Sequence, residues 1–241
     1  MRPATFMKKS SDFYWNIITN PTACSPKIAE LALNRFCDLM KGWEFREQRY
    51  GVLLDCIANI EKEVSVLASI KIMKKLVDNY PASPSASEKY TKTSCLDHLV
   101  TDKGLLEILI HNLKEFKNKL KSKAGNTPSE SELDKLAGDN SNYVTHIAER
   151  LSFIYFVLSN SSSEINLTTE LLKSIWDTVV NNAFVKSERD VLYKWLKEST
   201  ESKTSFPMSI DDLIQFFKEK MTDERESKHM TAEGFNCFQN F

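Results

Sequence analysis

The sequence predicts an all-α fold: an irregular α-solenoid of antiparallel helix pairs, HEAT- or armadillo-like, with about ten helices. Apolar residues recur at steps of three and four along most of the 241 residues, and the alternation of a strand is absent over any useful length. Only 6 Gly and 7 Pro are present, few for a sandwich or barrel, whose many turns use these residues. The links are mostly short and no repeat has a strict period, so irregular stacked pairs fit better than a tetratricopeptide or ankyrin array.

The composition and charge exclude several classes of partner. Hydrophobic residues make up 41% of the chain and charged residues 27%, as in a folded soluble protein. A formal net charge of -1 predicts no bulk attraction to nucleic acid or to an acidic membrane. No run approaches the ~20 apolar residues of a membrane span, and the N-terminus lacks the apolar stretch of a signal peptide. We therefore expect a cytoplasmic or nuclear protein with no membrane and no nucleic-acid partner.

Residues 1–80 are predicted to form the N-terminal part of the helical array. Ser25 and Pro26 indicate a helix start, because a capping hydroxyl precedes a proline at the first helical position. Three apolar faces follow, made of Ile28, Ala32, Phe36, Leu39, Met40 and Trp43, then Leu53, Cys56, Ile57 and Ile60, then Val66, Ile70, Met73, Val77 and Tyr80. Pro81 stops the third helix, and residues 81–93, rich in Pro and Ser, are predicted to be a loop.

Residues 94–241 are predicted to form the second part of the array. A short apolar piece precedes a long helix from about Asp102 to Lys123. The polar residues at about 124–141, with Gly and Pro among them, are expected to be a mobile loop. Two apolar seams identify the helices on either side of that loop, Leu106, Leu109, Leu113, Phe116 and Leu120 before it and Val144, Ile147, Leu151, Ile154 and Leu158 after it.

The stretch Leu171–Thr200 is predicted to be a helical hairpin. Its first half has two adjacent apolar rows, made of Leu171, Ile175, Val179 and Ala183 and of Leu172, Trp176 and Val180. Ser187 and Asp190 are spaced like a capping box, and Ser209 and Asp212 repeat the spacing before Leu213, Phe216 and Phe217. We expect Trp176 and Trp195 to pack in the interior, although Trp is also favoured at binding interfaces. A last helix is expected from Thr231, and the apolar end at Phe238 and Phe241 suggests a piece of a longer chain.

Candidate chemistry is weak everywhere, and we expect no catalytic, cofactor-binding or metal-binding residue in this chain. The cysteines are dispersed and odd in number, which favours neither disulfides nor a zinc cluster. Cys95 and His98 form a C-x-x-H pair, but zinc needs about four ligands and no second pair has ligand spacing, so Cys95 is expected in the core. No cysteine has the helix start or Gly-rich turn of a nucleophile. The cysteines are Cys24, Cys37, Cys56, Cys95 and Cys237, and the histidines are His98, His111, His146 and His229.

The run Lys114–Lys123 is basic and allows two interpretations. A solvated helix face is favoured, because Phe116 and Leu120 keep the apolar seam and the total charge is balanced. The alternative is a surface that binds RNA or acidic lipid, which would show salt-dependent binding that is lost when the lysines become glutamine.

Several short elements follow one another in a fixed order after Tyr90. They are Glu149-Arg150-Leu151 with Phe153, Lys173 with Ile175-Trp176, Glu188-Arg189-Asp190, Lys194-Trp195, and Thr231 with Gly234, Cys237 and Phe238. This set, with the segment KTSCLDHLV and the long helix after it, resembles the armadillo-like helical region of the very large ubiquitin-specific proteases of the fat facets type. The resemblance covers about Tyr90 to Phe241, whereas residues 1–89 share only the helical style.

The resemblance implies a function. That family removes ubiquitin with a catalytic Cys, His and acidic residue held in a separate domain, and its cysteine and histidine boxes are absent from this sequence. The chain is therefore expected to be a non-catalytic scaffold segment of a large deubiquitinating enzyme, supporting the catalytic domain and binding ubiquitinated substrates or regulators. The alternative is a free-standing helical adaptor without protease activity, which a complete short reading frame would favour and a longer frame with a cysteine box would exclude.

Overall fold

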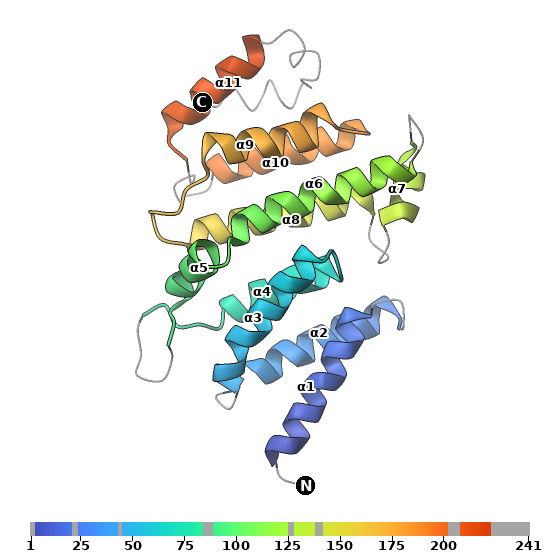
Figure 1. Cartoon of the computed structure of the whole chain (residues 1–241), viewed down its shortest axis with the longest axis vertical. Helices are drawn as coiled ribbons and strands as arrows, with labels where there is room; N and C mark the ends of the chain where they lie inside the picture. The colour runs from blue at the N-terminus through green and yellow to red at the C-terminus, as the bar shows by residue number, and fades with distance from the viewer. Residues whose placement is uncertain are drawn as a thin grey trace. The chain divides into compact units, whose positions relative to one another are not determined.

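The all-α prediction is confirmed by the computed structural model (Figure 1). The structure describes residues 3–20, 24–42, 45–83, 89–124, 128–137, 142–201 and 208–222. Within these ranges the regular structure consists of eleven α-helices and one π-helical turn, without any strand. The chain divides into two compact units, Met1–Ile108 and Leu109–Phe241, and each is described by itself.

The first unit contains α1 (Pro3–Thr19), α2 (Pro26–Met40), α3 (Arg46–Glu61), α4 (Val66–Val77) and α5 (Lys92–Thr101). Helix α1 packs on α2, α3 packs on α4, and α4 also contacts α2 and α5. The core includes the faces predicted for α3 and α4, in which Leu53, Ile60, Ile70 and Met73 have no exposed surface. Antiparallel pairs therefore stack here as the apolar seams predict.

Helix α1 is a difference from the prediction, which begins the array at Ser25. In its second half the apolar residues Phe13–Trp15, Ile17 and Ile18 are nearly contiguous in the sequence, so no seam at steps of three and four stands out there. Ile18 is buried, while Phe13 is 60% exposed. The hydroxyl of Ser65 donates a hydrogen bond of 2.7 Å to the carbonyl of Thr19, which satisfies one open acceptor at the end of α1.

Two helix starts in this unit differ in detail from the prediction. Ser25 occupies the N-cap position of α2 before Pro26, but its side chain makes no capping hydrogen bond, and Ile28 is 51% exposed instead of buried. Helix α5 begins at Lys92, so the predicted loop 81–93 ends earlier, because Thr91 and Ser94 form a reciprocal capping box. Trp43 lies outside the described residues.

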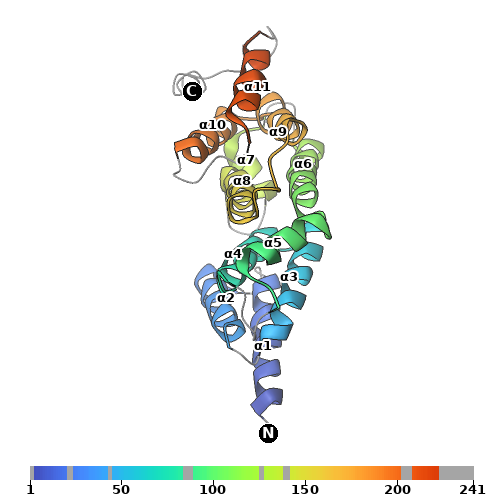
Figure 2. The ribbon, with the colours of Figure 1, turned by 90° about the vertical axis from the view of Figure 1, so that its left-hand side faces the viewer.

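The second unit contains most of α6 (Leu105–Lys123), then α7 (Glu130–Ala137), α8 (Tyr143–Asn160), α9 (Thr169–Trp176), the π-turn η3 (Asp177–Asn181), α10 (Lys186–Glu201) and α11 (Ile210–Thr222). Figure 2 shows α6 and α9 along one side of this unit and α8 and α10 along the other. Helix α10 packs on α8 and on η3, and α11 packs on α9. The predicted hairpin is therefore present as α9–η3 followed by α10.

The predictions for the segment 124–141 and for the start of the long helix are wrong. The segment 124–141, predicted to be a mobile loop, contains α7, since the backbone N–H and hydroxyl of Ser129 both donate to Glu132 Oε2 at 2.9 Å and Leu133 is completely buried. The long helix begins at Leu105 instead of Asp102, because Gly104 has a φ of 63° and so separates α5 from α6. The predicted last helix from Thr231 lies outside the described residues.

Candidate functional site

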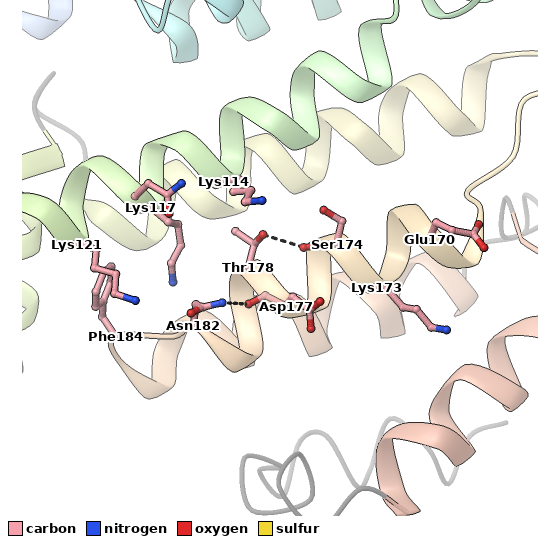
Figure 3. Close-up of a pocket in the computed structure, with 11 residues that line it drawn as sticks. Lys114, Lys117, Lys121, Glu170, Lys173, Ser174, Asp177, Thr178, Asn182 and Phe184 are labelled. Atoms are coloured by element: carbon pink, nitrogen blue, oxygen red, sulfur yellow. Dashed lines mark hydrogen bonds between the residues drawn. The ribbon is translucent and has the colours of Figure 1, made fainter.

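A polar groove of about 480 Å³ lies between α6 and the α9–η3 segment (Figure 3). All of its lining residues belong to the second unit. They are Lys114, Lys117, Asn118, Lys121, Glu170, Lys173, Ser174, Asp177, Thr178, Asn182 and Phe184. A concave polar surface between helices of a stacked array is where such proteins usually bind partners, so this groove is the candidate site.

The α6 wall of the groove is basic. Lys114, Lys117 and Lys121 are spaced by three and four residues, so they lie on one face of the helix, and Figure 3 shows them above η3 and the turn that follows it. Lys114 and Lys121 are exposed to solvent, as predicted for a solvated face, and neither makes an ion pair within the described part of the chain. Lys117 differs from that prediction, because only 4% of it is exposed.

The opposite wall is shaped by the π-turn. The backbone N–H of Asn182 donates to the carbonyl of Asp177 at 3.1 Å, an i to i+5 bond, and the Asn182 side chain donates to the same carbonyl at 2.7 Å. The hydroxyl of Thr178 donates to the carbonyl of Ser174 at 2.8 Å. π-turns are rare and are often found at functional sites. The apolar residues at steps of four predict a continuous α-helix to Ala183, so this sequence pattern gives no indication of the π-turn.

A buried ion pair joins α6 to the start of α10. The ammonium of Lys117 contacts the carboxylate of Glu188, which has no exposed surface. Glu188 Oε1 also accepts the backbone N–H groups of Phe184 at 2.7 Å and Val185 at 3.2 Å. The Lys117 ammonium lies 4.8 Å from the ring centroid of Phe184 and 5.9 Å from that of Tyr143. Glu188 therefore caps the turn before α10 and binds that turn to α6.

This arrangement corrects the predicted capping box of Ser187 and Asp190. Helix α10 begins at Lys186, so Ser187 is already helical, and its hydroxyl donates to Glu130 of α7. The turn is capped by Glu188 instead. Lys117 carried a signal that the prediction missed: it follows Leu113 by four residues and precedes Leu120 by three, and both leucines are buried.

Burial and charge act on the ionisable groups around this pair. Burial lowers the pKa of Lys117, and the nearby negative charge of Glu188 opposes that effect. The pKa of the Tyr143 hydroxyl is raised, first by burial and then by the charge of Glu188. The ammonium of Lys117 is thus held by its carboxylate and by two aromatic faces instead of by water.

The groove is positively charged on a chain that is nearly neutral. Because the buried carboxylate of Glu188 compensates Lys117, the accessible positive groups are Lys114, Lys121 and Lys173. Against the carboxylates of Glu170 and Asp177 they give the accessible lining a formal charge of +1, compared with -1 for the whole chain. Lys173 Nζ lies 3.5 Å from Glu219 Oε2, with both side chains about half exposed, so this contact is weak.

The described cysteines do not contribute a reactive thiol to the groove. Burial raises the pKa of Cys37 to about 11 and that of Cys95 to about 12, and it raises the pKa of Cys56 as well. Cys95 is completely buried, as predicted, while His98 Nδ1 lies 2.7 Å from Asp102. No group of three or more His, Cys, Asp and Glu side chains in the described ranges is arranged to hold a metal ion. Cys24 is half-buried, and Cys237 lies outside those ranges.

Several residues of the described elements that carry the family resemblance pack in the core. Trp176 has no exposed surface and meets the rings of Tyr193, Phe216 and Phe217 edge-on, and Trp195 is 7% exposed, so the interior placement of both tryptophans is confirmed. The guanidinium of Arg150 is buried between α6 and α8. It donates to Asn112 Oδ1 at 2.8 Å and to the carbonyl of His146 at 3.0 Å, and it lies 4.4 Å from the ring centroid of Phe116.

Comparison with known proteins finds similarity along the chain. A family model described as "UBP24/USP9X/USP9Y ARM repeat" matches residues 2–241, which extends beyond the range from Tyr90 that the short elements cover. Human "Ubiquitin carboxyl-terminal hydrolase 9Y" is 23% identical over 146 residues, and Drosophila melanogaster "Probable ubiquitin carboxyl-terminal hydrolase FAF" is 20% identical over 181 residues. These alignments cover 61% and 73% of this chain but 6% of each relative's length.

Mouse "Ubiquitin carboxyl-terminal hydrolase 9X" is 20% identical over 182 residues, which is 74% of this chain and 7% of that protein. The chain therefore spans only a small fraction of the length of the curated relatives that it matches. Among the described helices, none has the length and apolar character needed to cross a bilayer.

Proposed function

Because the chain belongs to the UBP24/USP9X/USP9Y ARM repeat family, we propose that it is a non-catalytic scaffold segment of a large deubiquitinating enzyme. In this role it supports the catalytic domain and binds substrate or regulatory proteins. The observation that carries the proposal is the family match over residues 2–241, in a chain that aligns with a short stretch of ubiquitin carboxyl-terminal hydrolases. Stacked helix pairs are a common framework for extended protein-binding surfaces.

The environment of the cysteines supports a non-catalytic role for this segment. A thiol protease needs an accessible thiolate beside a base, and buried apolar surroundings favour the neutral thiol. Burial raises the pKa of Cys37, Cys56 and Cys95, so these three thiols are unsuited to nucleophilic attack. We further propose that the partners are proteins, with no role for nucleic acid or membrane, and that the protein acts in the cytoplasm or nucleus.

Two measurements test the proposal. The purified chain is incubated with ubiquitin carrying a fluorogenic group at its C-terminus, and we expect no release above the buffer control. Release that is lost when the cysteines are alkylated would overturn the non-catalytic assignment. The second measurement is the complete reading frame, in which we expect a separate domain with a cysteine box and a histidine box. A frame without them would overturn the assignment to a deubiquitinase and would favour the free-standing adaptor.

The scaffold role is tested in the longer enzyme that the proposal implies. Removing this segment should slow cleavage of ubiquitin from protein substrates, while cleavage of the small fluorogenic substrate should change little, because the latter needs only the catalytic domain. If removing the segment changed the cleavage rate of neither the protein substrates nor the small substrate, the segment would neither support the catalytic domain nor bind substrates.

A further inference from the structure

We propose that the groove between α6 and α9–η3 binds a short acidic peptide segment of a partner protein. This inference rests on the proposed function and specifies the chemistry of one partner that the scaffold would bind. It depends on three features of the groove: the spacing of its free lysines, the hydrogen-bond acceptors between them, and the rigid turn that forms one end.

The free lysines set the charge and the length of the peptide. Lys114 and Lys121 lie seven residues apart on one face of α6, which places them about 10 Å apart along the helix axis. An extended peptide covers that distance in about three residues. Lys173 lines the opposite wall, where its ammonium lies 3.5 Å from Glu219 Oε2. A segment of three to four residues with two carboxylates therefore spans the free ammonium groups of Lys114 and Lys121.

The neutral side chains between the lysines offer acceptors. Asn118 donates through Nδ2 to Glu115 Oε1 at 3.0 Å, and Asn182 donates through Nδ2 to the carbonyl of Asp177, so the Oδ1 atom of each amide can accept. The hydroxyl of Thr178 uses its proton on the carbonyl of Ser174 and likewise keeps its lone pairs. A peptide backbone supplies N–H donors to such acceptors, whereas phosphate groups supply none at neutral pH.

The remaining charges also favour a peptide over a nucleic acid or a membrane. Glu170 and Asp177 lie on the same wall as Lys173 and would repel a continuous row of phosphates. A peptide can place neutral residues opposite these carboxylates and acidic residues opposite the lysines. The total formal charge of -1 gives no long-range attraction to a polyanion that would offset this repulsion.

The end of the groove is formed before any ligand binds. Phe184 lines it, and the backbone N–H of Phe184 is held by Glu188, which is in turn paired with Lys117. Both charged groups are almost completely buried, so neither is available to a ligand. A fixed turn reduces the conformational entropy that binding would otherwise cost. The ligand therefore meets a formed surface whose mobile parts are the lysine side chains.

The experiment measures fluorescence anisotropy of a labelled octapeptide of alternating Glu and Ser, with the Gln–Ser octapeptide as the neutral comparison. We expect the acidic peptide to bind the intact chain and Lys114→Gln/Lys121→Gln to weaken that binding about tenfold. The matched control is Lys119→Gln/Lys123→Gln, which removes the same charge from exposed positions of α6 outside the groove. This control should change the Kd less than about twofold, and circular dichroism should show equal melting for both variants.

Equal losses in the two double variants, or equal binding of the Glu and Gln peptides, would overturn the proposal. Oligo-uridine RNA and phosphatidylserine vesicles are measured in parallel. Groove-dependent binding of either one as tight as that of the acidic peptide would also overturn it in favour of a general anion site. These results leave the scaffold role untouched, because that role is judged by deleting the segment and comparing protein and small substrates. Cysteine-dependent cleavage by the chain would overturn the proposed function and not the peptide site.

Discussion

Replacing Lys117 by Met removes the positive partner of the buried pair and leaves the Glu188 carboxylate without a counter-charge. Breaking such a pair typically costs about 3–5 kcal/mol. At pH 7 the cost is bounded by the alternative of binding a proton, about 3.7 kcal/mol for an ordinary carboxyl group. Two backbone N–H groups continue to donate to the carboxylate, so we expect Lys117→Met to lower the free energy of unfolding by about 3 kcal/mol.

The reciprocal variant, Glu188→Gln, keeps an acceptor for the turn but leaves the Lys117 ammonium buried. Releasing the proton of an ordinary lysine costs about 4.6 kcal/mol at pH 7, which is the upper limit of the loss. The double variant has no buried charge and keeps the turn capped, so it should lose about 1 kcal/mol or less. Urea unfolding of the four proteins, followed by circular dichroism, gives the coupling energy between the two side chains.

The stability of Glu188→Gln should depend on pH. Burial lowers the pKa of Lys117, so in Glu188→Gln the folded state holds fewer protons than the unfolded state below the ordinary lysine pKa. Its free energy of unfolding should therefore rise between pH 7 and pH 9. Additive losses in the two single variants, or a free energy of unfolding of Glu188→Gln that falls over this pH range, would refute the reasoning.

Three further outcomes can be measured on the same chain. Trp176→Ala should lower the free energy of unfolding by about 3–5 kcal/mol, because a completely buried indole and its aromatic contacts are lost; urea unfolding with a loss below about 1 kcal/mol would contradict this. In a Cys237→Ser background, Ellman's reagent at pH 8 should modify Cys24 quickly and Cys95 only at the rate of unfolding, and equal rates would show that Cys95 is accessible. Leu133→Ala should cost about 2–4 kcal/mol and speed proteolysis of α7; an unchanged cleavage rate would mean that α7 is not docked.

The helices with a continuous apolar seam could be predicted from the sequence, because their periodicity records the side that faces the core. The seam from Leu106 to Leu120 and the row from Leu172 to Val180 are of this kind, and nearly all of their residues are buried. Helix α7 could not be predicted in this way, since it has the single buried residue Leu133 and one position defines no period. Helix α1 was not predicted for the opposite reason: several apolar residues of its second half are adjacent in the sequence and so show no helical period.

Only one wall of the groove could be predicted from the sequence. The basic face of α6 is visible in the sequence as the run Lys114–Lys123. Its opposite wall comes from residues about sixty positions later, and no local pattern states which helices will lie side by side. The partner of Lys117 is 71 residues away in the sequence. The burial of this one lysine within the basic run is therefore visible only in the folded chain. Local sequence thus indicates the chemistry of one wall but not the shape of the site.

The π-turn Asp177–Asn181 has a consequence for how the length of this segment can vary. A turn closed by i to i+5 hydrogen bonds holds one residue more than a turn closed by i to i+4 bonds. Deleting one of its residues can be absorbed by conversion to a regular α-helix. The same deletion within α9 would rotate the following side chains by about 100° and move Trp176 out of the core. A helix of this protein therefore contains a position where a single-residue deletion can be tolerated, which is usually a property of loops.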